Sequence, residues 1–162
     1  MTTVPEFAII IPTYNRPSPL RACLDSISRQ EITDADWEVI VVDDGGDCPL
    51  DDTVASFQKI ITIQLLCQKN AGPAAARNYG VGQTKARYLI FLDDDCSVPP
   101  HWLETIFRQV KKTEADVLGG KTINSLKGNL FAETSQLLVD YLYTYYNRNP
   151  DNCRFFTSNN ML

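Results

Sequence analysis

A run of apolar residues that ends in three consecutive aspartates constrains the fold of this chain more than any other feature. Residues 88–92 read Tyr-Leu-Ile-Phe-Leu, and Asp93, Asp94 and Asp95 follow directly. An uninterrupted apolar run with branched and aromatic side chains is typical of a parallel strand that is covered on both faces. Ligands of open α/β sheets bind at the carboxyl ends of such strands. We therefore expect the three carboxylates to lie at a ligand-binding edge.

The three aspartates have the chemistry of a metal site. Side chains alternate along a strand, so Asp93 and Asp95 are expected on one side and Asp94 on the other. Two like charges about 4 Å apart repel by roughly 4 kcal/mol at an effective dielectric of 20, which favours a bound cation. Oxygen ligands alone favour Mg²⁺ or Mn²⁺, so we predict that Asp93 and Asp95 bind one of these ions. The alternative is that the acids cap the helix that Pro99 and Pro100 open.

Two earlier apolar runs end in polar residues in the same way. Residues 7–11 form a run that Pro12 ends, and residues 37–42 form the second run. If both are parallel strands, right-handed crossovers place their carboxyl ends at the same edge as the three aspartates. The polar residues expected at this edge are Thr13, Tyr14, Asn15 and Arg16 after the first run, and Asp43 and Asp44 after the second.

Strand and helix patterns alternate along the rest of the chain. A chain of 162 residues is long enough to bury about 70% of its unfolded surface around one core. We therefore predict a single doubly wound α/β domain over residues 1–162, with a mostly parallel sheet. Further strands are expected at residues 59–67 and 117–121, and helices at 17–27, 51–57, 74–79, 99–110 and 128–147.

The helix expected at residues 128–147 is apolar on more than one face. Either more chain covers the second face, or this helix is a peripheral contact with a membrane surface or a lipid-linked substrate. No segment approaches the ~20 apolar residues that span a bilayer, and residues 1–6 lack the features of a signal peptide. We therefore expect a cytoplasmic protein, at most attached to the inner face of the membrane. The net charge of −5 argues against a nucleic-acid partner.

Each polar group at the predicted edge suits one part of a nucleotide. Carboxylates accept from a base N–H or from ribose hydroxyls, an aromatic ring such as Tyr14 stacks on a base, and Arg77 pairs with phosphate. A metal ion would neutralise a diphosphate leaving group. Taken singly, Tyr14 can be a packing residue, Asp43 or Asp44 can cap a turn, and Arg77 can be solvated. Taken together, so many acids at one edge predict a nucleotide site.

Four segments in this order carry a resemblance to a known family. They read Ile-Ile-Pro-Thr-Tyr-Asn-Arg at 10–16, Val-Val-Asp-Asp-Gly at 41–45, Asn-Ala-Gly-Pro-Ala-Ala-Ala-Arg-Asn-Tyr-Gly at 70–80 and Phe-Leu-Asp-Asp-Asp at 91–95. They closely resemble the successive motifs of family-2 glycosyltransferases with the GT-A fold, whose nucleotide-binding half is Rossmann-like. The resemblance covers nearly the whole chain, and residues 157–159 resemble the later acceptor-side segment of the family.

The resemblance implies a function and a set of site residues. Members transfer a sugar from a nucleotide-sugar, usually a UDP-sugar, to an acceptor hydroxyl with inversion. The acceptor is a carbohydrate, lipid-linked or protein group, as in polysaccharide biosynthesis for the cell envelope. Asp93 and Asp95 would form the Asp-x-Asp site for Mn²⁺ or Mg²⁺. The nucleotide-binding set that we predict is Pro12, Thr13, Tyr14, Asn15, Arg16, Asp43, Asp44, Asn70, Gly72, Arg77, Asp93 and Asp94, of which Pro12, Thr13, Tyr14 and Asp43 would cradle the nucleoside and Arg77 would support the nucleotide.

The resemblance assigns no catalytic base to this chain. In the family this carboxylate normally lies in a Glu-Asp pair well downstream of the Asn-rich segment, and the sequence ends at Leu162 before any such pair. We therefore expect a chain that is truncated at its C-terminus, with the general base beyond Leu162. Such a chain is expected to bind nucleotide and metal but to transfer sugar poorly.

Other protein classes also place aspartates after a strand. Haloacid dehalogenase phosphatases and response-regulator receivers carry them on their first strand, whereas other predicted strands precede the run that ends at Asp93. A nucleotidyltransferase is closer in fold, but its glycine-rich Lys/Arg signature after the first strand is replaced by Pro-Thr-Tyr-Asn-Arg. A non-catalytic nucleotide-binding domain that lacks its acceptor half is the remaining alternative. Sequence beyond Leu162 would discriminate between these classes.

Overall fold

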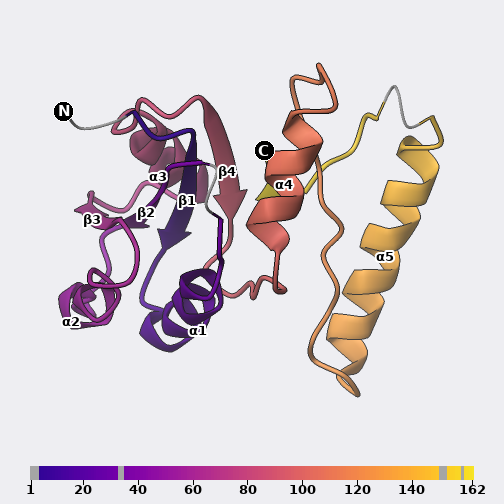
Figure 1. Cartoon of the computed structure of the whole chain (residues 1–162). Helices are drawn as coiled ribbons and strands as arrows, with labels where there is room; N and C mark the ends of the chain where they lie inside the picture. The colour runs from indigo at the N-terminus through magenta and orange to yellow at the C-terminus, as the bar shows by residue number, and fades with distance from the viewer. Residues whose placement is uncertain (1–3, 33–34, 150–152, 158) are drawn as a thin grey trace.

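The computed structural model describes residues 4–32, 35–149, 153–157 and 159–162. Its five-stranded sheet has the order β3-β2-β1-β4-β5 and carries helices on both faces (Figure 1). Strands β1 to β4 are parallel, and β5 pairs with β4 in the antiparallel direction. The predicted doubly wound α/β class with a mostly parallel sheet is confirmed. The strands are β1 (Phe7–Thr13), β2 (Trp37–Asp43), β3 (Ile63–Cys67), β4 (Tyr88–Leu92) and β5 (Asn160–Met161).

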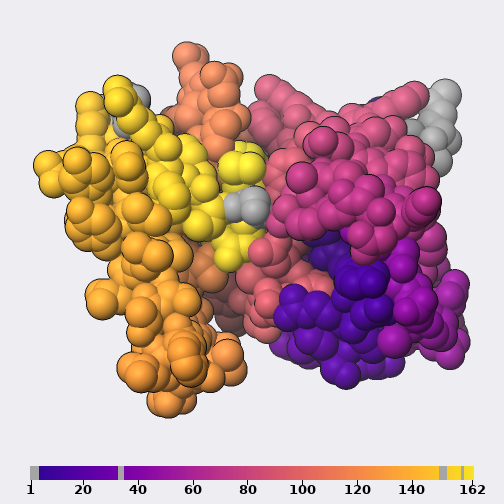
Figure 2. Space-filling view, turned by 180° about the vertical axis from the view of Figure 1, so that it is seen from behind, coloured from indigo at the N-terminus to yellow at the C-terminus, as the bar shows by residue number. Residues whose placement is uncertain are grey.

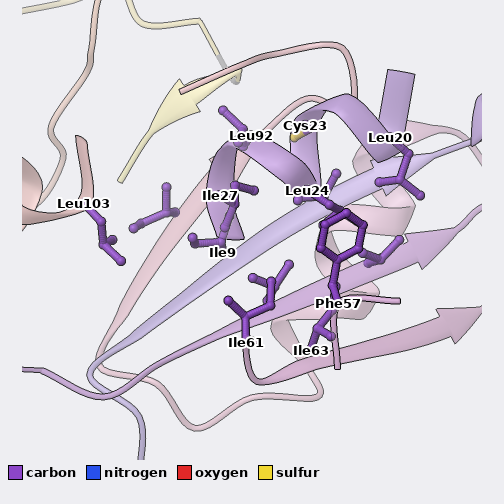
Figure 3. Close-up of a cluster of buried hydrophobic side chains, with 14 of the residues drawn as sticks. Ile9, Leu20, Cys23, Leu24, Ile27, Phe57, Ile61, Ile63, Leu92 and Leu103 are labelled. Carbon is purple, nitrogen blue, oxygen red and sulfur yellow. The ribbon is translucent and has the colours of Figure 1, made fainter. Parts of the chain in front are cut away.

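Alternating side chains of the central strands build two apolar layers, one on each face of the sheet. Phe7, Ile9 and Ile11 of β1 pack with residues of three helices, α1 (Pro17–Ser28), α2 (Asp51–Ala55) and α4 (Trp102–Val110). Figure 3 shows this larger layer, in which side chains of α1 point toward the strands. Ala8 faces the other way and packs with Ala76 of α3 (Pro73–Val81). Because both faces are covered, every residue of β1 is buried.

Helix α3 lies very close to the sheet because its inward residues are small. Ala76 is fully buried, and a Cβ atom at Gly80 would come within 2.8 Å of Cγ2 of Ile10. The helix begins at Pro73, where the fixed φ and missing N–H of proline suit a first turn. This close packing fixes the position of α3 over the sheet and therefore the position of Arg77, which the helix carries.

The strand predicted at residues 117–121 is wrong. Gly119 forms an isolated antiparallel bridge with Met161, and Leu118 and Leu162 exchange two backbone hydrogen bonds of 2.9 Å. The edge of the sheet beside β4 is occupied instead by β5, which pairs with Phe91 and Leu92. Residues 118–120 therefore lie along the outer side of β5 and form a single bridge instead of a strand.

Helix α5 (Leu130–Tyr146) is attached to the rest of the chain by polar contacts. The Tyr143 hydroxyl lies 3.3 Å from the Gly120 carbonyl oxygen, and Gln136 donates to the Thr122 carbonyl oxygen at 3.0 Å. Figure 2 shows the C-terminal residues, in orange and yellow, as a lobe beside the sheet region. Its exposed apolar side chains include Leu130, Phe131, Leu137, Leu138 and Tyr141.

The second apolar face predicted for α5 therefore lies on the surface. Its contact with a membrane or a lipid-linked substrate stays a prediction. Within the described ranges, no helix has the length and apolar character needed to cross a bilayer.

Candidate functional site

The candidate site lies where the strand order of the sheet reverses. Strand β1 pairs with β2 on one side and with β4 on the other. Ligands of doubly wound sheets bind in the crevice at such a point. A pocket of about 350 Å³ lies here, and its walls come from the carboxyl ends of β1, β2 and β4 and from α3. The lining residues are Pro12, Thr13, Tyr14, Arg16, Asp44, Pro73, Arg77, Asp93, Asp94 and Asp95.

Two arginines pair with the three aspartates that follow β4. Arg16 bridges two of them, with its Nη1 2.9 Å from Asp94 Oδ1 and its Nη2 2.8 Å from Asp95 Oδ2. Arg77 of α3 pairs with Asp93 through its Nη2. These five side chains carry one net negative charge. Because both signs of charge are present, the pocket has groups that can bind a cation and groups that can bind an anion.

The alternation that we expected for the three aspartates stays a prediction, because β4 ends before these residues. Strand β4 ends at Leu92, and Asp93 begins a turn in which the Cys96 N–H donates to the Asp93 carbonyl oxygen at 3.1 Å. The period of the strand therefore does not extend to the aspartates. As a result, Asp94 and Asp95 share one arginine, whereas Asp93 pairs with another.

Asp94 is the buried member of the three. Its side chain is 5% exposed, against 35% for Asp93 and 52% for Asp95. The Thr13 hydroxyl donates to Asp94 Oδ2 at 2.7 Å. Burial raises the pKa of Asp94, the Thr13 hydrogen bond and Arg16 lower it, and the resulting pKa lies above the ordinary value. Asp94 therefore ties the turn after β4 to the end of β1, while its contact with a nucleotide stays a prediction.

Arg77 has one polar atom without a partner. Its side chain is 16% exposed, and its Nε is buried with no hydrogen-bond partner among the described residues. Leaving such a buried donor unsatisfied costs about 1–3 kcal/mol. Guanidinium groups donate to phosphate oxygens in a fixed fork geometry. Arg77 is therefore well placed to bind an anionic ligand in the pocket that it lines.

Asn15 and Asp43 shape loops beside the pocket and are not among its lining residues. Asn15 has a φ of 53°, and its Oδ1 accepts from the Asp47 N–H at 2.7 Å. Asp43 is buried, and its Oδ1 accepts from the Gly46 N–H at 2.9 Å. The structure thus gives both residues a role in loop geometry, and their contact with a nucleotide stays a prediction.

Asp44 holds the loop that precedes α3. Its Oδ1 accepts from Gln68 Nε2 at 2.7 Å and from the Ala71 N–H at 2.9 Å, and its Oδ2 accepts from the Gly72 N–H at 2.8 Å. Burial alone raises the pKa of Asp44, but the three hydrogen bonds together lower it below the ordinary value. Asn70, in the same loop, is exposed and lies outside the pocket lining. We did not predict Gln68, although its position directly after the third strand is a signal for this edge.

Replacing Asp44 with alanine is expected to lower the free energy of unfolding by about 1–3 kcal/mol, because two backbone N–H groups lose a buried acceptor. A lowered pKa means that Asp44 stabilises the fold above the ordinary carboxylate pKa of about 3.9. This stabilisation is lost as the pH falls through the lower pKa of the folded state. Urea unfolding at neutral and at acidic pH measures both effects.

The control for this variant is Asp47→Ala, which removes an exposed carboxylate from the loop after β2. It is expected to change stability by less than about 0.5 kcal/mol. An Asp44→Ala variant that is as stable as the wild type at neutral pH would show that the three hydrogen bonds do not hold the loop.

The donor set fits a divalent cation that binds together with a phosphate ligand. Over residues 4–32, 35–149, 153–157 and 159–162, no group of three or more His, Cys, Asp or Glu side chains is arranged as a metal site. Asp93 and Asp95 each contact an arginine through one carboxylate oxygen. The second oxygen of each carboxylate could bind a cation. Mg²⁺ is usually bound by one or two protein carboxylates, with water and substrate phosphates completing its shell.

Comparison with known sequences identifies relatives that are named as glycosyltransferases. Residues 8–162 match the model of the family described as Glycosyl transferase family 2. Glycosyltransferase AglE of Haloferax volcanii is 32% identical over 121 residues, which are 74% of this chain and 40% of that protein. Glycosyltransferase GlyA of Streptococcus pneumoniae is 30% identical over 154 residues, which are 93% of this chain and 21% of that protein. The chain thus spans less than half the length of these relatives.

Solved structures share the fold of this chain. The mannosyltransferase PcManGT from Pyrobaculum calidifontis, in complex with GDP-Man and Mn²⁺, has a TM-score of 0.71 at 19% identity over 99% of this chain and 44% of that one. S. aureus TarS 1-349, in complex with UDP-GlcNAc, has a TM-score of 0.67 at 23% identity over 75% of this chain and 38% of that one. At these identities the likeness shows the GT-A fold. The family match over residues 8–162, with the relatives beside it, shows that this chain belongs to glycosyl transferase family 2.

Proposed function

We propose that this chain binds the donor substrate of a glycosyltransferase that moves a sugar from a UDP-sugar to an acceptor hydroxyl. Membership of glycosyl transferase family 2 supports sugar transfer and disfavours the nucleotidyltransferase alternative. The observation that carries the proposal is the pocket at the strand-order reversal, where three carboxylates and two arginines meet. The arginines can bind the phosphates of a nucleoside diphosphate, and the carboxylates can bind its cation.

Each part of the donor has a counterpart in the pocket. Tyr14 is 48% exposed, so its ring has a free face on which a base can stack beside Pro12. Asp93 and Asp95 would hold Mn²⁺ or Mg²⁺, which when bound neutralises charge on the departing diphosphate. Arg77 would donate its unpartnered Nε to a phosphate oxygen.

The proposed reaction is an inverting displacement. The acceptor oxygen forms a bond to the anomeric carbon while the bond from that carbon to the diphosphate oxygen breaks on the opposite face. A carboxylate general base takes the hydroxyl proton, and we assign that base to no residue of this chain. The chemistry requires only a hydroxyl, so carbohydrate, lipid-linked and protein acceptors all fit.

The solved structures support a nucleoside diphosphate, and the family resemblance supports uridine as its base. The two solved structures compared above hold UDP-GlcNAc in one case and GDP-Man with Mn²⁺ in the other, and both ligands are sugars on a nucleoside diphosphate. The resemblance to family-2 glycosyltransferases, whose nucleotide is usually uridine, supports UDP. The chemistry of the carboxylates supports metal dependence.

Calorimetric titration of the chain with UDP, in Mn²⁺ and in EDTA, tests this proposal. UDP is expected to bind in both conditions and more tightly in Mn²⁺, because the cation offsets the repulsion between the carboxylates and the diphosphate. GDP and TDP are the controls for the base and are expected to bind more weakly. A chain that is folded by circular dichroism and binds none of the three nucleotides would show that the proposal is wrong. A transfer assay then separates an enzyme from a non-catalytic nucleotide-binding domain.

A further inference from the structure

Arg16 contacts two of the three aspartates at once, and the two contacts differ in burial. We propose that Arg16 is an exchangeable counter-ion of Asp95, which releases this carboxylate when a divalent cation binds and then presents its freed Nη2 to the diphosphate. This inference rests on the function proposed above, and it adds a coupling between the cation and the nucleotide. Its starting point is the pair of contacts from Nη1 to Asp94 at 2.9 Å and from Nη2 to Asp95 at 2.8 Å.

The contact between Arg16 and Asp94 is expected to persist. Asp94 is 5% exposed, and its other oxygen accepts from the Thr13 hydroxyl at 2.7 Å. Without Arg16, the buried Asp94 carboxylate would keep the Thr13 hydroxyl but lose its counter-charge, which is unfavourable for a group that water cannot reach. Arg16 therefore stays beside the pocket whether or not a cation is bound.

The contact between Arg16 and Asp95 is expected to exchange. Asp95 is 52% exposed and Arg16 is 47% exposed, so water can replace either partner at little cost. A divalent cation carries twice the charge of a guanidinium group and binds carboxylate oxygens directly. It therefore competes with Nη2 for Asp95 and not for the buried Asp94.

The exchange changes the charge of the pocket as well as its donors. The three aspartates and two arginines carry one net negative charge, and Asp44, which also lines the pocket, adds a second. A bound divalent cation therefore brings the net charge of the lining to zero. Nη2 of Arg16 becomes a free donor at the edge of the same pocket. The cation and the nucleotide are therefore expected to strengthen each other's binding.

Arg16→Gln tests the exchange because it removes the charge that competes with the cation. Without nucleotide, the affinity for Mn²⁺, measured by electron paramagnetic resonance of the free ion, is expected to rise about 2- to 5-fold. With saturating Mn²⁺, the affinity for UDP is expected to fall about 10-fold or more, because phosphate loses a charge-assisted donor. Opposite signs of the two effects are the signature of an exchangeable counter-ion.

Two further variants control for charge and for folding. Arg16→Lys keeps the charge and is expected to bind Mn²⁺ within about 2-fold of the wild type, but UDP more weakly, because one ammonium group cannot replace the guanidinium fork. Arg29→Gln removes the same charge from an exposed pair with Asp25 and is expected to leave both affinities unchanged. Thermal unfolding confirms that each variant is folded.

The outcomes separate this inference from the proposed function. A folded Arg16→Gln variant with reduced or unchanged Mn²⁺ affinity would overturn the inference, because Arg16 would then support Asp95 rather than compete for it. Wild-type affinity of Arg16→Lys for UDP would overturn it as well. In both cases the proposed function would stand. A wild-type chain that binds neither Mn²⁺ nor UDP would overturn the inference and the proposed function together.

Discussion

Replacing Asp93 and Asp95 together with asparagine is expected to weaken UDP binding in Mn²⁺ by at least about 100-fold. Asparagine keeps the size of each side chain but removes both negative charges that would balance the cation. Changes to residues that only support metal ligands cost about 10- to 100-fold in metal affinity, so the loss of two ligands is expected to cost more. Calorimetric titration with UDP in Mn²⁺ measures the effect.

The same double variant gives the opposite result when metal is absent. In EDTA its affinity for UDP is expected to equal or exceed that of the wild type, because two carboxylates that repel the diphosphate are gone. The matched control is Asp51→Asn with Asp52→Asn, which removes two exposed carboxylates from the first turn of α2 and is expected to bind like the wild type in both conditions. Unaltered Mn²⁺-dependent binding by the Asp93 and Asp95 variant would remove the metal site from the proposal.

The central strands could be predicted from the sequence because each one is a short continuous stretch of mostly apolar residues. A strand that is covered on both faces needs mostly apolar residues, so β1, β2 and β4 contain the runs 7–11, 39–42 and 88–92. The parallel order of these strands then follows from right-handed crossovers. Since parallel strands deliver their carboxyl ends to one edge, the segments that line the pocket could also be predicted.

The details of that edge depend on contacts between residues that are distant in the sequence. Strand β5 has two residues, and nothing in Asn160 and Met161 indicates that they pair with β4. The turn that begins at Asp93 ends the strand period, so the orientation of the aspartates does not follow from their spacing. The role of Asp44 also depends on its partners, because the carboxylate that we expected to bind a nucleotide accepts three hydrogen bonds from the loop before α3.

Replacing Arg77 with methionine is expected to weaken UDP binding in Mn²⁺ by about 10- to 100-fold. A hydrogen bond to a charged group contributes about 1.5–3 kcal/mol, which corresponds to this range. The stability of the fold is expected to change by no more than about 1 kcal/mol. Methionine occupies much of the space of the arginine stem and removes the buried Nε that has no partner among the described residues. Asp93 loses an ion pair, but at 35% exposure its carboxylate can be solvated by water.

The combination of lost binding and retained stability is what identifies an arginine that serves a ligand. An arginine that serves the fold gives the reverse, because its removal costs several kcal/mol and leaves the affinity for UDP unchanged. Urea unfolding and calorimetric titration of Arg77→Met therefore decide between the two roles. The control is Arg87→Met, since Arg87 is exposed, lies before β4 at the opposite end of that strand and stacks over the Tyr88 ring at 5.0 Å. It carries the same charge change and is expected to leave UDP binding unaltered, which ties any loss in Arg77→Met to the pocket itself.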